Sequence, residues 1–368
     1  MLTERDEDCS HQGELVTAPG PTNIPDTESP VSTEDLRLAV RAATLYYLDG
    51  LTQAEVAQRL GVSRPTAGRL VARARAQGLV RIEVTVPPTW RDDLHAETER
   101  ALEERYGLVE AVVVGRRVDD AGPIEDSASF AALGRAAAGL LTRRLRPSDT
   151  LGFTWGPETV AVAQALPSGV ASCATIVQLD GSISTSAYQT GTEFVLGRCA
   201  EQLRAQPLRL PTPLYADPST VASMRTDSLI SRTLEVGRRA EVMIFGVGAV
   251  STSTTLFEGS FLDTAMLHEL DGLGAVGEIG GRFFRADGTA VHGELETRTM
   301  SVPLDDVRNC PATILVTGGQ SKHRAVLGAL RGGLANMLVC DIACAQYLLD
   351  HPDHALENDT PKDEAPPK

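Results

Sequence analysis

Residues 51 to 78, LTQAEVAQRLGVSRPTAGRLVARARAQG, predict the fold of the first structured part of the chain. Thr52 can cap a short helix, with Glu55 three residues later as its partner in a capping box. Ser63 can cap a second helix, whose first turn holds an arginine and a proline. Between the helices, Gly61 permits the left-handed backbone of a tight turn, so the two helices can stand roughly perpendicular. The spacing predicts a helix-turn-helix.

Apolar residues recur where the two helices would face each other, and the small Ala57 allows their close approach. The second helix is then free to enter the major groove of DNA. A solvated basic helix in an ordinary helical subdomain is the alternative, but capping, turn and apolar spacing together favour the first interpretation. The candidate DNA-contacting residues lie at the two helix N-termini and along the second helix: Thr52, Gln53, Ser63, Arg64, Pro65, Thr66, Arg69 and Arg73.

Charge is distributed unevenly along the sequence. The chain holds 34 lysines and arginines against 49 acids, and this net charge of −15 argues against a protein that coats nucleic acid with its whole surface. Between Leu36 and Val86, however, eight arginines stand against three acids, a local balance of +5. From Arg59 to Arg81 there are six arginines and no acid. Contact with a polyanion is therefore expected in this segment.

The sequence on either side of the motif divides the 368 residues into five parts. Both ends of the chain are rich in proline and charge and lack apolar periodicity, which predicts disorder. The predicted order is a disordered arm (1–31), a helix-turn-helix domain (32–87, ending in a strand at 79–86), a linker helix (88–107), a ligand-binding domain (108–350) and a disordered tail (351–368).

Cysteine usage and hydropathy limit the compartment and the chemistry. Six cysteines without a CxxC pair disfavour a disulfide framework and a zinc ribbon, and predict reduced core thiols. Because the chain shows no run of about 18 apolar residues and no signal-peptide layout, we expect a cytoplasmic protein without a membrane partner. Cys340 and Cys344 lack partners at metal spacing, and no metal site and no cofactor are predicted.

From residue 108 onward, apolar strands alternate with helices. Strands are expected within residues 109–115, 150–156, 174–181, 241–248, 312–319 and 336–341, and helices at 127–145, after Pro157, and at 191–203, 321–330 and 342–349. Alternation of this kind predicts an α/β domain with a mainly parallel sheet and helices on both faces. The predicted fold class is therefore α/β, with a helical domain in front.

Ligands of parallel sheets bind at the carboxyl ends of the strands, and four of the predicted strands end in small and polar residues. These ends are residues 152–156 (followed by Thr159), 180–182, 246–248 and 318–322. Each loop alone is more typical of a tight turn, but four together favour a site in which backbone N–H groups and hydroxyls hold an anion. Lys322 suits either an anion or a helix surface, and Trp155 either packing or stacking on a sugar.

The stretch from Gly277 to Phe284, GEIGGRFF, fits neither a helix nor a regular strand. It joins a carboxylate and a guanidinium to three glycines. Glu278 can bind hydroxyls, and Arg282 can bind either a phosphate or a neighbouring acid. Glu278 is the only carboxylate that the sequence places in the predicted pocket, and no second one is evident beside it.

The order of these motifs resembles a known family. The helix-turn-helix at 45–84 is followed by LGFTWGPET (151–159), GVGA (246–249), GEIGGRFF (277–284), VTGGQSKHRAVLGALRGG (316–333) and LVCD (338–341). This series is similar to the SorC family of sugar-responsive bacterial transcription regulators, over roughly residues 36 to 350. The resemblance implies a sugar-binding domain related in fold to sugar-phosphate isomerases and CoA transferases. It also implies oligomers that bind operator DNA and release it or rearrange when a phosphosugar binds.

Two positions depart from the family pattern. Relatives often carry Gly-Asp where this chain has Gly277-Glu278, and a second glycine where it has Ser182. A longer carboxylate and an added hydroxymethyl group change the volume of the pocket, so the effector can differ from those of other members.

The preferred hypothesis is a DNA-binding regulator that senses a phosphorylated sugar or polyol. We expect a homodimer or homotetramer on double-stranded operator DNA, because one helix-turn-helix covers only a half-site. The alternative is a sugar-phosphate isomerase or a CoA-transferase-like enzyme with an appended DNA-binding head, in which Glu278 would be the only candidate base. The predicted effector-binding residues are Gly152, Thr154, Trp155, Gly156, Thr159, Gly181, Ser182, Gly246, Gly248, Glu278, Arg282, Phe283, Gly319, Gln320 and Lys322.

Overall fold

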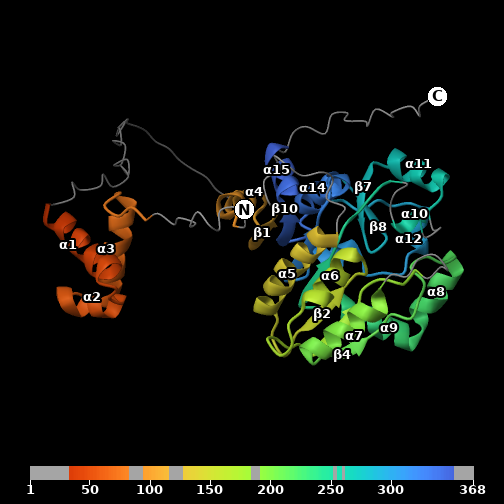
Figure 1. Ribbon diagram of the computed structural model, residues 1–368, viewed down its shortest axis with the longest axis horizontal. Helices are drawn as coiled ribbons and strands as arrows, with labels where there is room; N and C mark the ends of the chain where they lie inside the picture. Colours follow the sequence, from red (N-terminus) through yellow and green to blue (C-terminus); the bar gives the residue numbers. More distant parts are fainter. Residues whose placement is uncertain are drawn as a thin grey trace, which may run out of the picture. The chain divides into compact units, whose positions relative to one another are not determined.

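The computed structural model describes residues 33–82, 94–115, 127–183, 191–251, 255–258 and 262–351. The chain divides into two compact units, Met1–Thr85 and Val86–Lys368 (Figure 1). The first is helical and the second is an α/β domain, which confirms the predicted fold class. The arm expected at 1–31 lies outside the described residues, and so does the tail expected at 351–368 except for His351.

Helices build the described part of the first unit. They are α1 (Thr33–Ala43), which continues as the π-helical turn η1 (Thr44–Leu48), α2 (Gln53–Leu60) and α3 (Arg64–Ala76). The predicted capping box is present, since the Glu55 N–H donates to the Thr52 hydroxyl (3.4 Å) and the Thr52 N–H donates to Glu55 Oε2 (2.8 Å). Ser63 Oγ accepts from the Thr66 N–H (3.3 Å) and caps α3. Gly61 has φ 66° in the turn between α2 and α3, as the sequence predicts.

The prediction of a strand at residues 79–86 is wrong for residues 79–82, which are the part that the structure describes. Residues 79–82 form no regular element, and 83–86 lie outside the described residues. Val80 packs against the helical core, while Leu79 and Ile82 are exposed (39% and 55%). A strand needs a partner, and the described residues 33–82 contain no other strand, so apolar alternation alone does not produce one here.

Parallel strands form the centre of the second unit, after the helix α4 (Ala96–Tyr106). Across the sheet their order is β1 (Glu110–Val114), β10 (Met337–Asp341), β9 (Ala312–Thr317), β5 (Val242–Phe245), β2 (Thr150–Phe153), β3 (Thr175–Gln178) and β4 (Gln206–Leu208). Every neighbouring pair in this order is parallel. The six strands expected from the sequence are all present.

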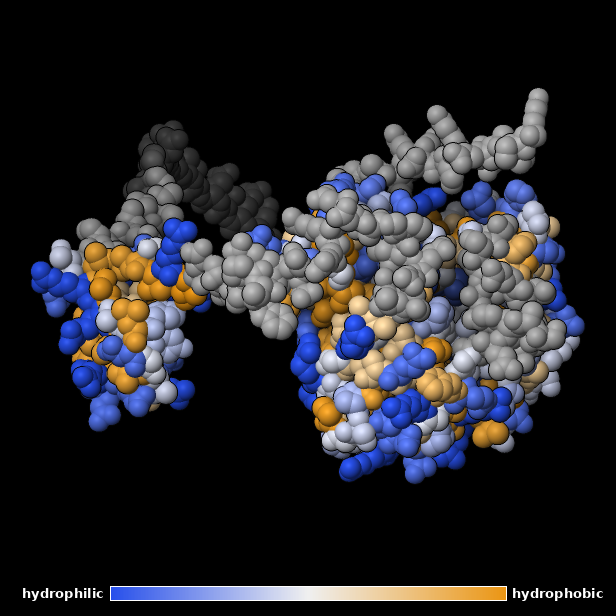
Figure 2. All heavy atoms as spheres, viewed as in Figure 1, coloured by the Kyte–Doolittle hydropathy of each residue, from blue (hydrophilic) through white to orange (hydrophobic). Residues whose placement is uncertain are grey.

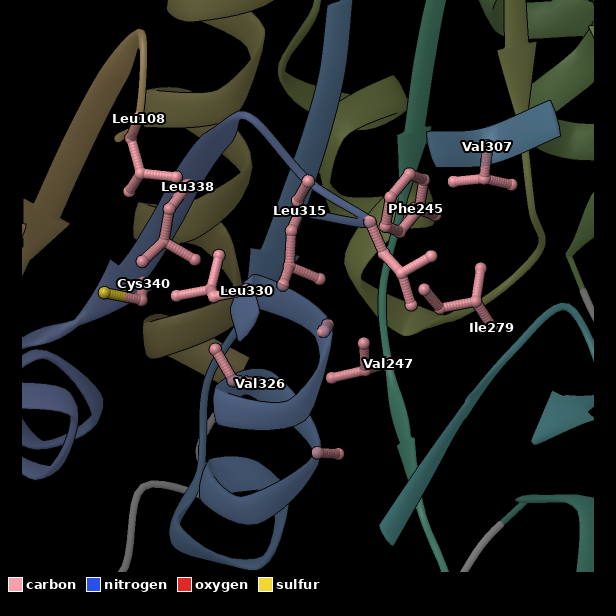
Figure 3. Packing of buried hydrophobic residues seen from close by; sticks show 14 of the residues in the cluster. Leu108, Phe245, Val247, Ile279, Val307, Leu315, Val326, Leu330, Leu338 and Cys340 are labelled. Carbon is pink, nitrogen blue, oxygen red and sulfur yellow. The ribbon is translucent and has the colours of Figure 1, made fainter. Parts of the chain in front are cut away.

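Helices cover both faces of this sheet because apolar side chains point alternately to either side. Figure 3 shows Val326 and Leu330 of α14 (His323–Arg331) turned toward Leu315 of β9 and Leu338 of β10. The neighbouring Ile314 and other alternate residues pack on the opposite face. That face is covered by α5 (Ser127–Arg144), α6 (Pro157–Ala165) and α7 (Thr192–Leu203), and the first face by α4, α14, α15 (Ile342–Asp350) and α9 (Ser228–Arg238).

The strand order reverses direction between β2 and β5. From β2 the chain moves outward through β3 to β4, and from β5 it moves the other way through β9 to β10. Adjacent strand ends at such a switch point open a crevice, and ligands of doubly wound sheets bind there. The topology therefore predicts a ligand site at the carboxyl ends of β2 and β5.

A small antiparallel sheet stands beside these strand ends. It consists of β6 (Gly248–Ala249), β7 (Ala275–Ile279) and β8 (Arg282–Arg285). The expectation that residues 277–284 are neither helix nor regular strand is wrong, because β7 and β8 form a hairpin through Gly280 and Gly281, which have φ 55° and 75°. The remaining helices are α8 (Pro218–Thr226), α10 (Thr255–Glu258), α11 (Thr264–Gly272), α12 (Glu294–Arg298), α13 (Leu304–Arg308) and the short η3 (Gln320–Lys322).

Hydrophilic and hydrophobic residues are intermixed on the visible surface of both units (Figure 2). On the first unit, Leu36, Val40 and Leu48 are exposed, Leu48 by 81%. None of the described helices has the length and apolar character needed to span a bilayer. The described cysteines are buried free thiols.

Candidate functional site

The predicted DNA-contacting side chains lie at the N-termini of α2 and α3 and along α3. Arg64, Arg69 and Arg73 are exposed, and among the described residues none of them forms an ion pair. Arg69 Nη2 donates only to the hydroxyl of Thr66 (3.4 Å), which also contacts Ser63 Oγ (2.8 Å). These guanidinium groups are therefore available to an external anion, which favours the DNA-contacting interpretation over a helix neutralised by the protein's own acids.

Small residues bring α2 and α3 together beneath this surface. Val56 and Ala57 of α2 and Ala67 of α3 are buried in the core of the unit. A Cβ at Gly68 would lie 3.3 Å from Gln53 Oε1, so the predicted DNA-contacting residue Gln53 lies directly over α3. Close packing of this kind fixes the orientation of the exposed α3 residues relative to α2.

At the carboxyl ends of the strands, Lys322 is ion-paired with a carboxylate that the sequence analysis did not select. Its ammonium contacts Glu158 Oε1. Glu158 lies in the first turn of α6, directly after β2, and Lys322 lies in η3, after β9. The Glu158 side chain is 3% exposed and that of Lys322 is 21% exposed. The pair therefore joins two of the four loops that were predicted to hold the ligand.

Glu278 of β7 faces the same region. Its Oε2 accepts a hydrogen bond from the Gly281 N–H (2.7 Å), and a Cβ at Gly248 would lie 2.0 Å from its Oε1. Burial raises the pKa of Glu278 to about 6, while the Gly281 hydrogen bond and the charge of Lys322 lower it and the charge of Glu158 raises it. A carboxyl group with such a pKa changes charge near neutral pH.

Asp180, which follows β3, is a third carboxylate in this group. Its Oδ1 accepts from the Trp155 N–H (3.3 Å), and its Oδ2 is buried without a hydrogen-bond partner. Burial raises the pKa of Asp180 well above its ordinary value, and the charge of Glu278 raises it further. A Cβ at Gly280 would lie 3.5 Å from the unpaired oxygen, so a glycine leaves space beside it.

The loop after β9 is held in place by a fourth acid. Gly319 has φ 93°, and its N–H donates to Asp341 Oδ2 (2.8 Å) at the end of β10. Asp341 Oδ1 accepts from the Cys344 N–H (2.7 Å) and caps α15. Among the described residues, none has an atom within 4 Å of a Cβ at Gly319. The loop is therefore anchored on one side and open on the other, with Gln320 exposed and Lys322 directed toward Glu158.

Several predicted effector-binding residues serve packing in this structure. A Cβ at Gly152 would lie 2.7 Å from Leu179, and one at Gly181 would lie 2.3 Å from the Pro213 carbonyl oxygen, so both positions require close approach. The hydroxyl of Thr159 donates to the Gly156 carbonyl (3.0 Å), and Ser182 Oγ accepts from Gln178 (3.0 Å). Trp155 Nε1 donates to the Gly181 carbonyl (2.8 Å), which holds the loops after β2 and β3 together.

Arg282 and Phe283 of β8 line a different part of the domain from the Glu158–Lys322 pair. Arg282 Nη2 donates to the Ser301 carbonyl (2.9 Å), and burial lowers the pKa of Arg282 to about 10. Both residues line a separate cavity formed with α11, α12 and the start of α13. Glu158, Asp180 and Lys322 are not part of that lining. The structure therefore groups Glu278 with Lys322 but not with Arg282.

The main residues that sequence reasoning missed are Glu158 and Asp180. The sequence analysis found no second carboxylate beside Glu278, and the structure corrects this, because the charge of Glu158 raises the pKa of Glu278 and the charge of Glu278 raises the pKa of Asp180. The only available signal was position, since each follows the end of a predicted strand. Glu158 after Pro157 is equally typical of an acid at an exposed helix N-terminus.

Comparison with known proteins assigns the chain to a family. Residues 93–350 match the Sugar-bind model of a sugar-binding domain, and residues 43–87 match the MarR family model. The full-length sorbitol operon regulator SorC of Klebsiella pneumoniae is 27% identical and has a TM-score of 0.62, with 86% of this chain and all of that chain covered. The chain belongs to the SorC family of sugar-responsive transcriptional regulators.

Further SorC-family relatives are also regulators. The deoxyribonucleoside regulator of Bacillus subtilis (strain 168) is 34% identical over 86% of this chain and 98% of its own length. The erythritol catabolism regulatory protein EryD of Brucella abortus (strain 2308) is 29% identical over 87% of this chain and 98% of its own. The SorC-family chain described here is thus a regulator with a DNA-binding and a sugar-binding domain, and these relatives decide against the enzyme alternative.

Proposed function

We propose that the effector of this SorC-family regulator is a phosphorylated sugar or polyol, bound at the carboxyl ends of β2, β3, β5 and β9. The observation that carries the proposal is the grouping of a lysine with carboxylates at the switch point of the sheet. Carboxylates accept hydrogen bonds from hydroxyl groups, and an ammonium binds phosphate as a point charge. A phosphorylated polyol offers both kinds of group in one molecule.

The two parts of such an effector would use different residues. Asp180 Oδ2, buried and unpaired, and Glu278 are suited to hydroxyl groups. Lys322 and the open loop at Gly319 and Gln320 are suited to the phosphate. A buried polar atom without a hydrogen-bond partner is costly, and Asp180 Oδ2 is such an atom. A hydroxyl of the effector that donates a hydrogen bond to it would therefore contribute more binding free energy than a hydroxyl that bonds to a solvent-exposed group.

Binding of the effector would alter the affinity for operator DNA. One helix-turn-helix covers a half-site, so we propose that a homodimer or homotetramer presents at least two α3 helices to double-stranded DNA. The exposed Leu36, Val40 and Leu48 of the first unit offer apolar surface to such an assembly. An effector shifts the equilibrium between two arrangements only if it binds them with different affinities.

A thermal-shift screen tests the effector class. The full chain is heated with a panel of sugar phosphates and, separately, with the parent sugars and polyols. A phosphorylated compound should raise the unfolding midpoint, because a ligand of the folded state stabilises it by mass action, and the same compound should change operator binding. Lys322→Ala should abolish most of the rise.

Arg324→Ala is the matched control for Lys322→Ala. It removes one positive charge two residues away, from an exposed position on α14. The proposal is wrong if parent sugars raise the midpoint as much as their phosphates do. If a sugar phosphate raises the unfolding midpoint of Lys322→Ala as much as that of Arg324→Ala, Lys322 does not bind the phosphate group.

A further inference from the structure

The Glu158–Lys322 ion pair has a consequence for any anion that binds at this site. Glu158 is 3% exposed, and a buried carboxylate keeps its charge at low cost only beside a partner. Its position in the first turn of α6 adds stabilisation from the helix dipole. Glu158 is therefore a strong competitor for the Lys322 ammonium.

The second oxygen of Glu158 faces the glycines of the switch point. A Cβ at Gly246, after β5, would lie 2.9 Å from Oε2, and one at Gly156, after β2, would lie 3.4 Å from it. These two loops follow the two strands between which the strand order reverses. The Glu158 carboxylate thus occupies the middle of the proposed effector site rather than its edge.

Lys322 is also shared electrostatically with a second acid. Its charge lowers the pKa of Glu278, and the charge of Glu158 raises that same pKa. The charge of Glu278 in turn raises the pKa of Asp180. Among the described residues, Glu158 and Glu278 therefore both interact with this one lysine, and an added phosphate meets repulsion as well as attraction.

We propose that Glu158 is a specificity-determining residue: a phosphate group reaches Lys322 only by displacing the Glu158 carboxylate. This inference rests on the proposed function. Inorganic phosphate carries no sugar hydroxyls that could offset the loss of the ion pair, so Glu158 disfavours its binding. A phosphorylated sugar adds hydrogen bonds from its hydroxyls to Asp180 and Glu278, and these contacts support the exchange. Glu158 thereby makes the site respond to the intact phosphate ester rather than to free phosphate.

Calorimetric titration of the full chain with inorganic phosphate tests the role of Glu158. Glu158→Gln keeps the shape of the side chain and removes its charge. We expect this variant to bind phosphate at least about tenfold more tightly than wild type, the size of one charge-assisted contact. The gain should vanish in the double variant Glu158→Gln/Lys322→Met, because Glu158 acts through Lys322.

Glu201→Gln is the matched control, since it removes an exposed carboxylate of α7 that is paired with Arg198 at the surface. Equal phosphate affinity of Glu158→Gln and Glu201→Gln would overturn the inference. A gain that persists without Lys322 would do the same. Circular dichroism establishes that each variant is folded, and Glu158→Ala, for which the same direction is expected, serves as the second variant at this buried position.

The outcomes separate this inference from the proposed function. If no sugar phosphate binds wild type while Glu158→Gln gains phosphate affinity, the proposed effector class is wrong, and only the competition between Glu158 and free phosphate for Lys322 stands. If sugar phosphates bind wild type and Glu158→Gln gains nothing for phosphate, the effector class stands and the role of Glu158 is wrong.

Discussion

Arg64 and Arg69 of α3 should control the salt dependence of operator binding. Both guanidinium groups are exposed and form no ion pair among the described residues. If each contacts a DNA phosphate, binding releases condensed counterions, and replacement by alanine removes that contribution. Arg64→Ala and Arg69→Ala should therefore weaken binding most at low salt.

The size of the change in salt dependence follows from the number of helix-turn-helix domains, or heads, that bind DNA in one complex. One lost phosphate contact lowers the slope of log K against log salt concentration by about 0.9, and a complex with two heads loses about 1.8 per substitution. A roughly fourfold rise in salt, from about 50 to about 200 mM, should then weaken wild type about 12-fold more than either variant. An arginine that reads a guanine edge would instead reduce discrimination between operators by about 1–3 kcal/mol.

Fluorescence anisotropy with a labelled operator at several salt concentrations measures these slopes. Arg37→Ala is the control, because Arg37 is equally charged but lies on α1 in an ion pair with Glu34 (3.5 Å). Its slope should stay closer to that of wild type. Identical slopes for wild type, Arg37→Ala, Arg64→Ala and Arg69→Ala would remove Arg64 and Arg69 from the DNA interface.

Two further predictions concern stability. Gly61→Ala should destabilise the α2–α3 turn by about 1 kcal/mol, because Gly61 has φ 66°. Gly68→Ala should be neutral or stabilising by up to about 1 kcal/mol, because Gly68 lies inside α3 and a Cβ there would meet the flexible Gln53 side chain. Hydrogen exchange of residues 51–78 measures both, and changes of the same sign would contradict the turn geometry. The raised pKa of Glu278, about 6 against an ordinary 4.5, means that its contribution to stability is full below pH 4.5 and is lost as the pH rises through 6. Glu278→Gln should therefore gain about 2 kcal/mol on wild type between pH 4.5 and about pH 7. Urea unfolding at each pH checks this, and parallel pH profiles would refute it.

Local chemistry made the first unit predictable. The capping box at Thr52 and the turn at Gly61 depend on residues at most three apart, so the sequence contains the whole signal. The hairpin of β7 and β8 was missed although Gly280 and Gly281 are typical of a tight hairpin turn, because three glycines hid the alternation of the strands. A strand was expected at 79–86 because its alternation was clear, and no partner could be tested from the sequence.

The composition of the effector site was only half predictable. Lys322 and Glu278 of the proposed site were selected from the sequence because glycine-rich strand ends lie beside them. Glu158 was missed because its burial depends on β5 and β9, which lie far along the chain, and no local pattern carries that information. Gly152 and Gly181 were selected from the sequence as effector-binding residues, but packing against a neighbouring side chain or carbonyl is enough to require a glycine at each position. The sequence does not place those neighbours nearby.

The loop that carries Lys322 is linked through α15 to α4, the helix that precedes the sheet. His323 follows Lys322, and its ring centroid lies 4.8 Å from that of Tyr347 on α15. On α4, the Tyr106 hydroxyl donates to the Leu348 carbonyl of the same α15 (2.7 Å). The effector loop and α4 are thus joined through two successive contacts within one unit. Contiguity is a condition for coupling but does not measure it, because a ligand changes an equilibrium only by its difference in affinity for the two states. Tyr347→Ala therefore tests the coupling through two measurements, its affinity for a sugar phosphate and the effect of that sugar phosphate on operator binding. If the two contacts carry the coupling, the affinity should stay the same and the effect on operator binding should change.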